Sequence, residues 1–149
     1  MRKLLGYKIK NDHLGKGREL NQLYSPQDKN IAQVPGNILE VLLQLENDTY
    51  LLFLTDDSPY EECLYVLLLD HQYRILDRVD LYQEYICGIF SDLRVLGTYE
   101  LSFTFLENQK FHLKIEIPPK FKLQRFFDLD PIHYPNQSQK TYITIGLHT

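Results

Sequence analysis

Short apolar runs separated by polar turns follow one another along most of this chain, which is typical of antiparallel strands. Residues 38–46 and 49–55 form a hairpin if Asn47-Asp48 is its two-residue loop. Leu42, Leu51 and Phe53 interrupt the polar side of this hairpin, so we expect both of its faces to be covered. The register predicts these apolar pairs: Leu45 with Tyr50, Leu43 with Leu52, and Val41 with Leu54.

Two more hairpins follow. Residues 63–69 and 73–81 pair across Asp70-His71-Gln72, and the first of these strands is apolar on both faces, as in a strand buried within a core. A third hairpin turns at Glu107-Asn108-Gln109, and residues 141–147 form a last alternating strand. The third register predicts these pairs: Phe105 with Phe111, Phe103 with Leu113, Leu101 with Ile115, and Tyr99 with Ile117.

The pattern is weaker elsewhere. Ser25-Pro26 followed by Asp28 reads as a helix start, so we expect a short helix over residues 26–33 that stops before Pro35-Gly36. Residues 82–97 fit neither period, and helix and short strands both stay open. Residues 4–10 are a plausible first strand, which would let the two termini pair at one sheet edge.

These elements predict a mainly β fold of antiparallel hairpins, with α+β as the alternative. They form one meandering sheet, a sandwich or a partly open barrel. The 149 residues match a single domain spanning 1–149, long enough to bury a substantial core. The residues expected in that core are Val41, Leu43, Leu52, Leu101, Phe103, Leu113 and Ile115.

Composition narrows the class of protein. The first residues lack the apolar segment of a secretory signal, and the longest apolar run, residues 64–69, is too short to cross a membrane. Cys63 and Cys87 lie in apolar runs without the spacing of metal ligands, which favours two reduced, buried thiols. We therefore expect a soluble cytoplasmic protein.

Charge is unevenly distributed along the chain, whose net charge is −4. Residues 1–30 have a net charge of +4, residues 31–109 of −11, and residues 110–149 of +3, which together give −4. Such asymmetry bears on association with partners and not on the fold.

No catalytic, metal or cofactor motif stands out. Gly15-Lys16-Gly17 lacks the length and the following Ser or Thr of a phosphate-binding loop. His13, and His133 near Asp130, lack the paired spacing of a zinc or calcium site. Cys87 looks too buried to act as a nucleophile. We expect no catalysis, no metal and no cofactor.

The acidic connection between the first two hairpins is the most distinctive surface feature. It holds four carboxylates and a tyrosine, and more tyrosines and acids follow nearby, a composition suited to a cationic protein partner. Small, acidic, tyrosine-rich chains of this kind are similar in type to bacterial immunity proteins, which neutralise toxins, although no motif carries that similarity. The residues expected to bind the partner are Asp56, Asp57, Tyr60, Glu61 and Glu62.

Two alternatives use another part of the chain. Residues 110–127 interleave lysines and an arginine with phenylalanines, as a module for single-stranded nucleic acid requires. A metal-independent ribonuclease would combine His112 and Lys114 on an outer sheet face with a second histidine, for which the sequence leaves four candidates: His13, His71, His133 and His148. An exposed first or last strand would also allow a homodimer by strand pairing.

Overall fold

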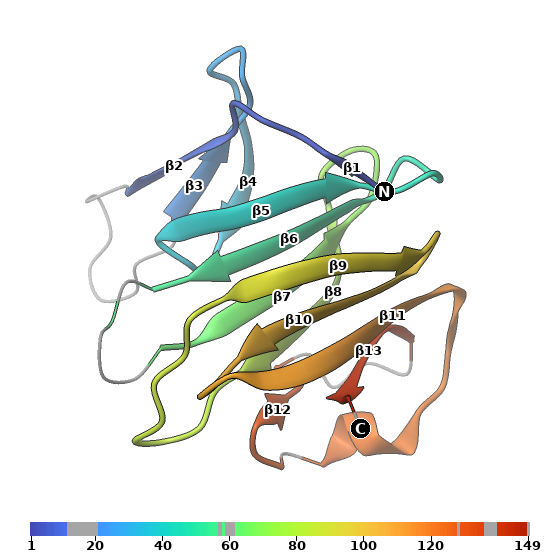
Figure 1. Cartoon of the computed structure of the whole chain (residues 1–149). Coiled ribbons are helices and arrows are strands. Elements are labelled where there is room, and N and C mark those ends of the chain that lie inside the picture. Colours follow the sequence, from blue (N-terminus) through green and yellow to red (C-terminus); the bar gives the residue numbers. More distant parts are fainter. Residues whose placement is uncertain (12–20, 57, 59–61, 128, 136–139, 149) are drawn as a thin grey trace.

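A computed structural model of the chain describes residues 1–11, 21–56, 58, 62–127, 129–135 and 140–148. Almost all of the regular structure in these ranges is β-strand (Figure 1). The elements are β1 (Arg2–Lys3), β2 (Lys8–Asn11), β3 (Asn21–Tyr24), β4 (Asn30–Val34), β5 (Ile38–Gln44), β6 (Tyr50–Thr55), β7 (Leu64–Leu69), β8 (Ile75–Leu81), β9 (Ser91–Gly97), β10 (Glu100–Phe105), β11 (Gln109–Lys120), the 3-10 helix η1 (Leu123–Phe126), β12 (Ile132–His133) and β13 (Thr141–Leu147).

The described strands form three antiparallel sheets. A six-stranded sheet has the order β1-β5-β6-β7-β8-β12, a four-stranded sheet the order β13-β11-β10-β9, and a three-stranded sheet the order β2-β3-β4. All three stay open, and none of them closes into a barrel. The prediction of a mainly β, antiparallel fold is confirmed.

The six-stranded sheet lies between the other two and is covered on both faces. One face packs against the four-stranded sheet through residues such as Phe53, Val66, Phe103 and Phe111. The other face packs against the three-stranded sheet, where Leu52 and Leu67 meet Leu23 and Val34. Each fully buried side chain of this size contributes about 1.5–3 kcal/mol, so these two interfaces provide the main drive for folding. All of the residues predicted for the core are buried.

The C-terminal part of the chain joins the two large sheets. After β11 the chain passes through η1, adds β12 beside β8 of the six-stranded sheet, and returns as β13 beside β11 of the four-stranded sheet (Figure 1). The three segments therefore close one side of the sandwich.

A buried ion pair holds this closure together. Arg125 of η1 is fully buried, and its Nη2 and Nη1 lie 2.6 and 3.1 Å from the carboxylate oxygens of Asp77 on β8. The same carboxylate accepts hydrogen bonds from the backbone amides of Tyr142 and Ile143 on β13, at 3.0 and 2.9 Å. The ring of Tyr134 lies against the Arg125 guanidinium, 4.7 Å away. One carboxylate thus links β8, η1 and β13.

The predicted helix over residues 26–33 is wrong. Residues 26–28 form the turn of a hairpin between β3 and β4, and Asp28 adopts a left-handed backbone with φ of 62°. Ser25 does act as a cap: its Oγ accepts a hydrogen bond from the amide of Lys29 at 3.2 Å, but it closes a hairpin and not a helix. Asn30–Val34 then pairs with β3 and supplies Val34 to the core.

The first hairpin exists, but its predicted register is wrong by one residue. Leu43 lies opposite Leu51, and Leu42 opposite Leu52, because the loop has three residues, Glu46-Asn47-Asp48, of which the last has φ of 60°. A slip of this size normally exposes the apolar face of a strand. Here both faces are buried, so the apolar pattern does not select one register.

The other two hairpins also exist. The loop between β7 and β8 begins one residue later than predicted. The loop between β10 and β11 begins one residue earlier than predicted. As a result Phe103 faces Phe111 and Leu101 faces Leu113, a shift of two residues that leaves every side chain on its predicted face. The doubly buried β7 strand is confirmed.

The remaining segments resolve as follows. Residues 82–90 contain a turn and irregular backbone, and residues 91–97 form β9. Residues 141–147 form the predicted last strand, but the termini do not pair, since β1 joins β5 while β13 joins β11. Among the described residues, no helix has the length and hydropathy that crossing a membrane requires.

We expect Asp77→Asn to lower the free energy of unfolding by about 3–5 kcal/mol, because it removes the buried negative charge that contacts the Arg125 guanidinium. Urea denaturation measures this loss. Asp28→Asn is the matched control: Asp28 pairs with Lys10 in solvent at 2.7 Å, and its loss should leave the free energy of unfolding nearly unchanged. Equal losses in the two variants would contradict the role given to the buried pair.

Gly88 is expected to tolerate no side chain. A Cβ at Gly88 would lie 2.4 Å from the ring of Phe105, whereas a Cβ at Gly146 meets nothing within 4 Å. Gly88→Ala should therefore destabilise the protein by about 1–3 kcal/mol through overpacking, and Gly146→Ala should be neutral or stabilising. Thermal unfolding of the two variants tests this, and a stable Gly88→Ala protein would contradict the packing described.

Candidate functional site

The acidic connection between β6 and β7 is described only in part. Asp57, Tyr60 and Glu61, three of the residues predicted to bind a partner, lie outside the described residues. Glu62 is described, and its carboxylate accepts hydrogen bonds from the backbone amides of Asp56 at 2.6 Å and Ser58 at 3.1 Å. The Glu62 carboxylate therefore joins the end of the acidic connection to its beginning, and its negative charge belongs to this surface.

Asp56 faces the adjacent strand. The hydroxyl of Tyr65 on β7 donates a hydrogen bond to Asp56 Oδ2 at 2.6 Å, and Asn37 donates one to the Asp56 carbonyl at 3.0 Å. Burial, and then the hydrogen bond to Asp56, raise the pKa of the Tyr65 hydroxyl, so it remains a donor throughout the physiological range. Asp56 therefore helps to hold the acidic connection against neighbouring residues, in addition to contributing a negative charge.

A partly buried polar cluster continues from Tyr65 toward β8. Arg78 makes a two-pronged contact with Asp80, both distances being 2.9 Å, and its guanidinium lies 5.3 Å from the centre of the Tyr65 ring. Burial raises the pKa of Asp80, and Arg78 opposes that shift. Burial, followed by the charge of Asp80, raises the pKa of the Cys63 thiol. Cys63 is therefore a poor nucleophile at neutral pH.

The turn after β8 meets the acidic connection. Leu64 at the start of β7 pairs with Leu81 at the end of β8, which brings residues 62–63 next to residues 82–84. Together these segments line a recess of about 220 Å³. Its lining residues are Glu62, Cys63, Tyr82, Gln83 and Glu84.

Tyr82 gives this recess an aromatic wall, and a second tyrosine, Tyr85, follows the lining residues along the chain. The ring of Tyr82 stacks on the imidazole of His133, with centroids 3.8 Å apart and planes inclined by 12°. His133 is in turn fixed by Asp130, 2.9 Å from its Nε2. Tyr85 is 87% exposed and adopts a left-handed backbone with φ of 63°. We call the surface formed by Glu62, Tyr82, Glu84 and Tyr85 the acidic face.

Other acids that the sequence suggested for this surface lie elsewhere. Asp77 and Asp80 are buried and paired with arginines. Glu46 and Asp48 lie in the turn before β6, whereas the acidic connection follows β6, so the length of that strand, about 20 Å, separates them. The signal for Tyr82 and Glu84 was present in the sequence, because the predicted hairpin already implied that they adjoin the connection.

The residues of the basic and aromatic segment 110–127 lie in different parts of the structure. Phe111 lies in the core and Arg125 is buried against Asp77, while Lys120 and Lys122 lie 3.8 and 3.1 Å from Glu116. Lys110 and Lys114 extend from β11 on the outer face of the four-stranded sheet, away from the core. The phenylalanines that the sequence placed in a stacking platform are exposed to different degrees: Phe121 64%, Phe126 39% and Phe127 56%. The segment as a whole is not one platform.

His112 lies on the same outer face, as predicted, and His148 is the histidine beside it. Their ring centroids are 6.3 Å apart, because His112 pairs with Gly146 and the amide of His148 bonds to the carbonyl of Lys110. His133 and His71 lie on other elements, and His13 is outside the described residues. Among the described residues, no group of three or more His, Cys, Asp or Glu side chains could hold a metal ion.

Comparison with protein-family models, with curated proteins and with solved structures found no match for this chain. The geometry of its surfaces is therefore the basis for any functional proposal.

The prediction of two buried thiols is wrong for Cys87, which is exposed in the irregular segment before β9. We expect iodoacetamide to alkylate Cys87 well before Cys63 at pH 8, because burial raises the pKa of the Cys63 thiol and leaves almost none of the reactive thiolate. Mass spectrometry of a time course measures both rates, with Cys87→Ser as the control that removes the fast site. Equal rates at the two cysteines would contradict the burial of Cys63.

Proposed function

We propose that this chain is a protein-binding domain whose acidic face binds a cationic protein. The observation that carries the proposal is the recess between Glu62, Tyr82 and Glu84, with the exposed Tyr85 following Glu84 along the chain. At about 220 Å³ the recess is below the roughly 300–1,000 Å³ of pockets for small molecules, and its size suits one side chain of a partner.

Arginine or lysine is the side chain that this recess favours. The carboxylates of Glu62 and Glu84 supply negative charge on either side, and the face of an aromatic ring attracts a cation at close range. Because stacking on His133 holds the Tyr82 ring in place, little side-chain freedom is lost on binding. The surrounding carboxylates would also accelerate the encounter with a basic protein.

Tyr85 supports an interface at this position. A non-glycine residue in the left-handed region carries a backbone cost of roughly 1–2 kcal/mol. Tyr85 occupies a turn that the Ile86 amide closes on the Gln83 carbonyl at 3.2 Å, and this turn leaves the tyrosine side chain 87% exposed. Tyrosine is enriched at the energetic centres of interfaces, where it offers a large contact area with little loss of freedom. A bound partner would use this surface.

A toxin with a basic active site is the class of partner that we propose. Carboxylates and tyrosines on a rigid sheet end suit a surface that must cover a cationic cleft, and burial raises the pKa of Cys63, the thiol that lines the recess. The proposal is thus of an immunity-type inhibitor, with Asp57, Tyr60 and Glu61 of the connection as further contact residues.

Affinity capture from the native host tests this function. The tagged protein should retain a basic protein at one-to-one stoichiometry, and Glu84→Lys with Tyr85→Asn should weaken that complex tenfold or more, mostly through slower association at low salt. Asparagine is chosen at position 85 because it tolerates the left-handed backbone. Surface plasmon resonance with the captured partner measures both rates.

Glu46→Lys with Asp48→Asn is the matched control, since it alters the acidic turn at the other end of β6. It should leave the affinity within about twofold. A partner that is acidic, or one whose binding depends equally on both pairs of residues, would overturn the proposed face. Absence of any stoichiometric protein partner would overturn the function.

A further inference from the structure

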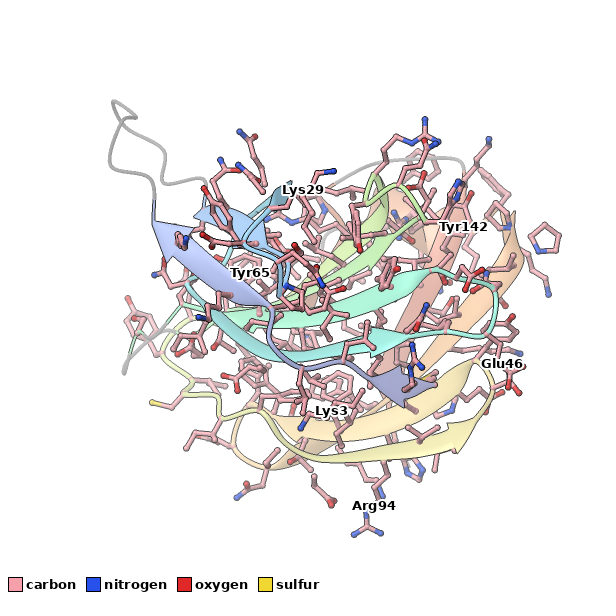
Figure 2. All side chains as sticks on the ribbon, turned by 90° about the horizontal axis from the view of Figure 1, so that it is seen from above. Lys3, Lys29, Glu46, Tyr65, Arg94 and Tyr142 are labelled. Atoms are coloured by element: carbon pink, nitrogen blue, oxygen red, sulfur yellow. The ribbon has the colours of Figure 1, made fainter. Side chains whose placement is uncertain are left out.

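The outer face of the four-stranded sheet, on the side away from the core, is a polar platform. Pairing across the strands sets its side chains in three rows. The first row is Ser91, Thr104, Lys110 and His148; the second is Arg94, Ser102, His112 and Gly146; the third is Glu100, Lys114 and Thr144. Figure 2 shows Arg94 directed outward on this side of the molecule.

Basic and hydroxyl groups dominate the platform. Arg94 lies 3.0 Å from Asp92, and His112 lies 3.3 Å from Glu100, so one cation and one imidazole each have an acidic neighbour. Lys110 and Lys114 flank His112 on β11, and His148 lies beside it. The hydroxyls of Ser91 and Thr104 lie 2.5 Å apart in the first row.

Ser102 gives the platform an unused hydrogen-bonding group. It lies between Arg94 and His112 and is 1% exposed, yet its Oγ has no hydrogen-bond partner among the described residues. A buried hydroxyl without a partner normally carries a free-energy cost of about 1–3 kcal/mol. An acceptor bound above the second row would remove that cost once the side chains that cover the hydroxyl in the free protein move aside. Gly146 leaves open space in the same row, with nothing within 4 Å of the position of a Cβ.

We propose that this platform binds the phosphodiester backbone of single-stranded nucleic acid. Lysine, arginine, histidine and hydroxyl side chains are the usual ligands of phosphate oxygens. The alternate residues Lys110, His112 and Lys114 repeat about every 6.7 Å along β11, a spacing comparable with that of successive phosphates in an extended strand. His112 and His148 also present rings on which a base can stack.

A flat sheet face of this kind suits a single strand better than a duplex. It offers no helix or ribbon to enter a groove of a duplex. Its two lysines, Lys110 and Lys114, extend along the single strand β11, whereas a duplex presents two parallel lines of phosphates. The proposal is independent of the acidic face, which lies where β7 begins and β8 ends in the other large sheet.

Fluorescence anisotropy with labelled oligouridylate and oligothymidylate of about 12 nucleotides tests the platform at low and moderate salt. Lys110→Glu with Lys114→Glu should weaken binding at least tenfold and reduce the salt slope by about 0.7 for each phosphate that is no longer neutralised. Equal binding of the two oligomers points to the shared backbone as the ligand, and tighter binding of the RNA adds an interaction with the 2′-hydroxyl.

Lys8→Glu with Lys29→Glu is the matched control. It changes the net charge equally but lies in the three-stranded sheet and its hairpin turn, and Figure 2 shows Lys29 on the side opposite Arg94. Its binding should stay within about twofold of the parent protein. Equal weakening in both variants, tighter binding of inorganic polyphosphate than of either oligomer, or no binding at low salt would each overturn the proposal.

Ser102→Ala tests whether the Ser102 hydroxyl contributes to binding or only to the stability of the protein. Removing an unpartnered buried hydroxyl should leave the protein as stable or more stable, while binding of the oligomers weakens about three- to tenfold. A variant that binds as tightly as the parent would exclude Ser102 from the site. The same measurement with Glu84→Lys should show no change in nucleic-acid binding, which keeps this test distinct from that of the acidic face.

Discussion

The buried contact between Asp77 and Arg125 is the constraint on which the arrangement of the sheets depends. Two opposite charges meet in the interior, where burying an ion is costly unless it is paired. This contact joins residues that are 48 positions apart in the chain, on either side of β9, β10 and β11. The amides of Tyr142 and Ile143, which bond to the same carboxylate, then fix β13. Asp77 thereby satisfies two amides near the start of β13, the edge strand of the four-stranded sheet.

Both candidate surfaces follow from this closure. β12 lies beside β8 and supplies His133, on which Tyr82 stacks at the wall of the acidic recess. β13 lies beside β11 and is followed by His148, which completes the polar platform with His112. The two surfaces lie on different sheets, one at a strand end and the other on a sheet face.

Much of the strand content could be predicted from the sequence, and the registers could not. Alternation places side chains on the correct face when one face is polar, as for β10 and β11, where an error of two residues changed no face. It fails for β5 and β6, because Leu42 and Leu43 are both buried, on opposite faces. The helix expected near Pro26 failed for a related reason: Ser, Pro and Asp favour a tight turn as well as a helix start, and only pairing with β3 decides between them.

Charge summed over segments was a poor guide to the surfaces, because such a sum ignores which groups the fold uses. The acidic middle segment loses Asp77 and Asp80 to buried arginine pairs, and Asp56 and Glu62 bond to neighbouring groups of the connection. The basic segment after residue 110 likewise loses Arg125, and Glu116 partly neutralises Lys120 and Lys122. What remains is sorted by surface and not by position in the chain. Acids and exposed tyrosines meet where β7 begins and β8 ends, and cations alternate with the core residues of β11. Alternation itself causes this second pattern, since every other residue of a strand that covers a core must face away from it.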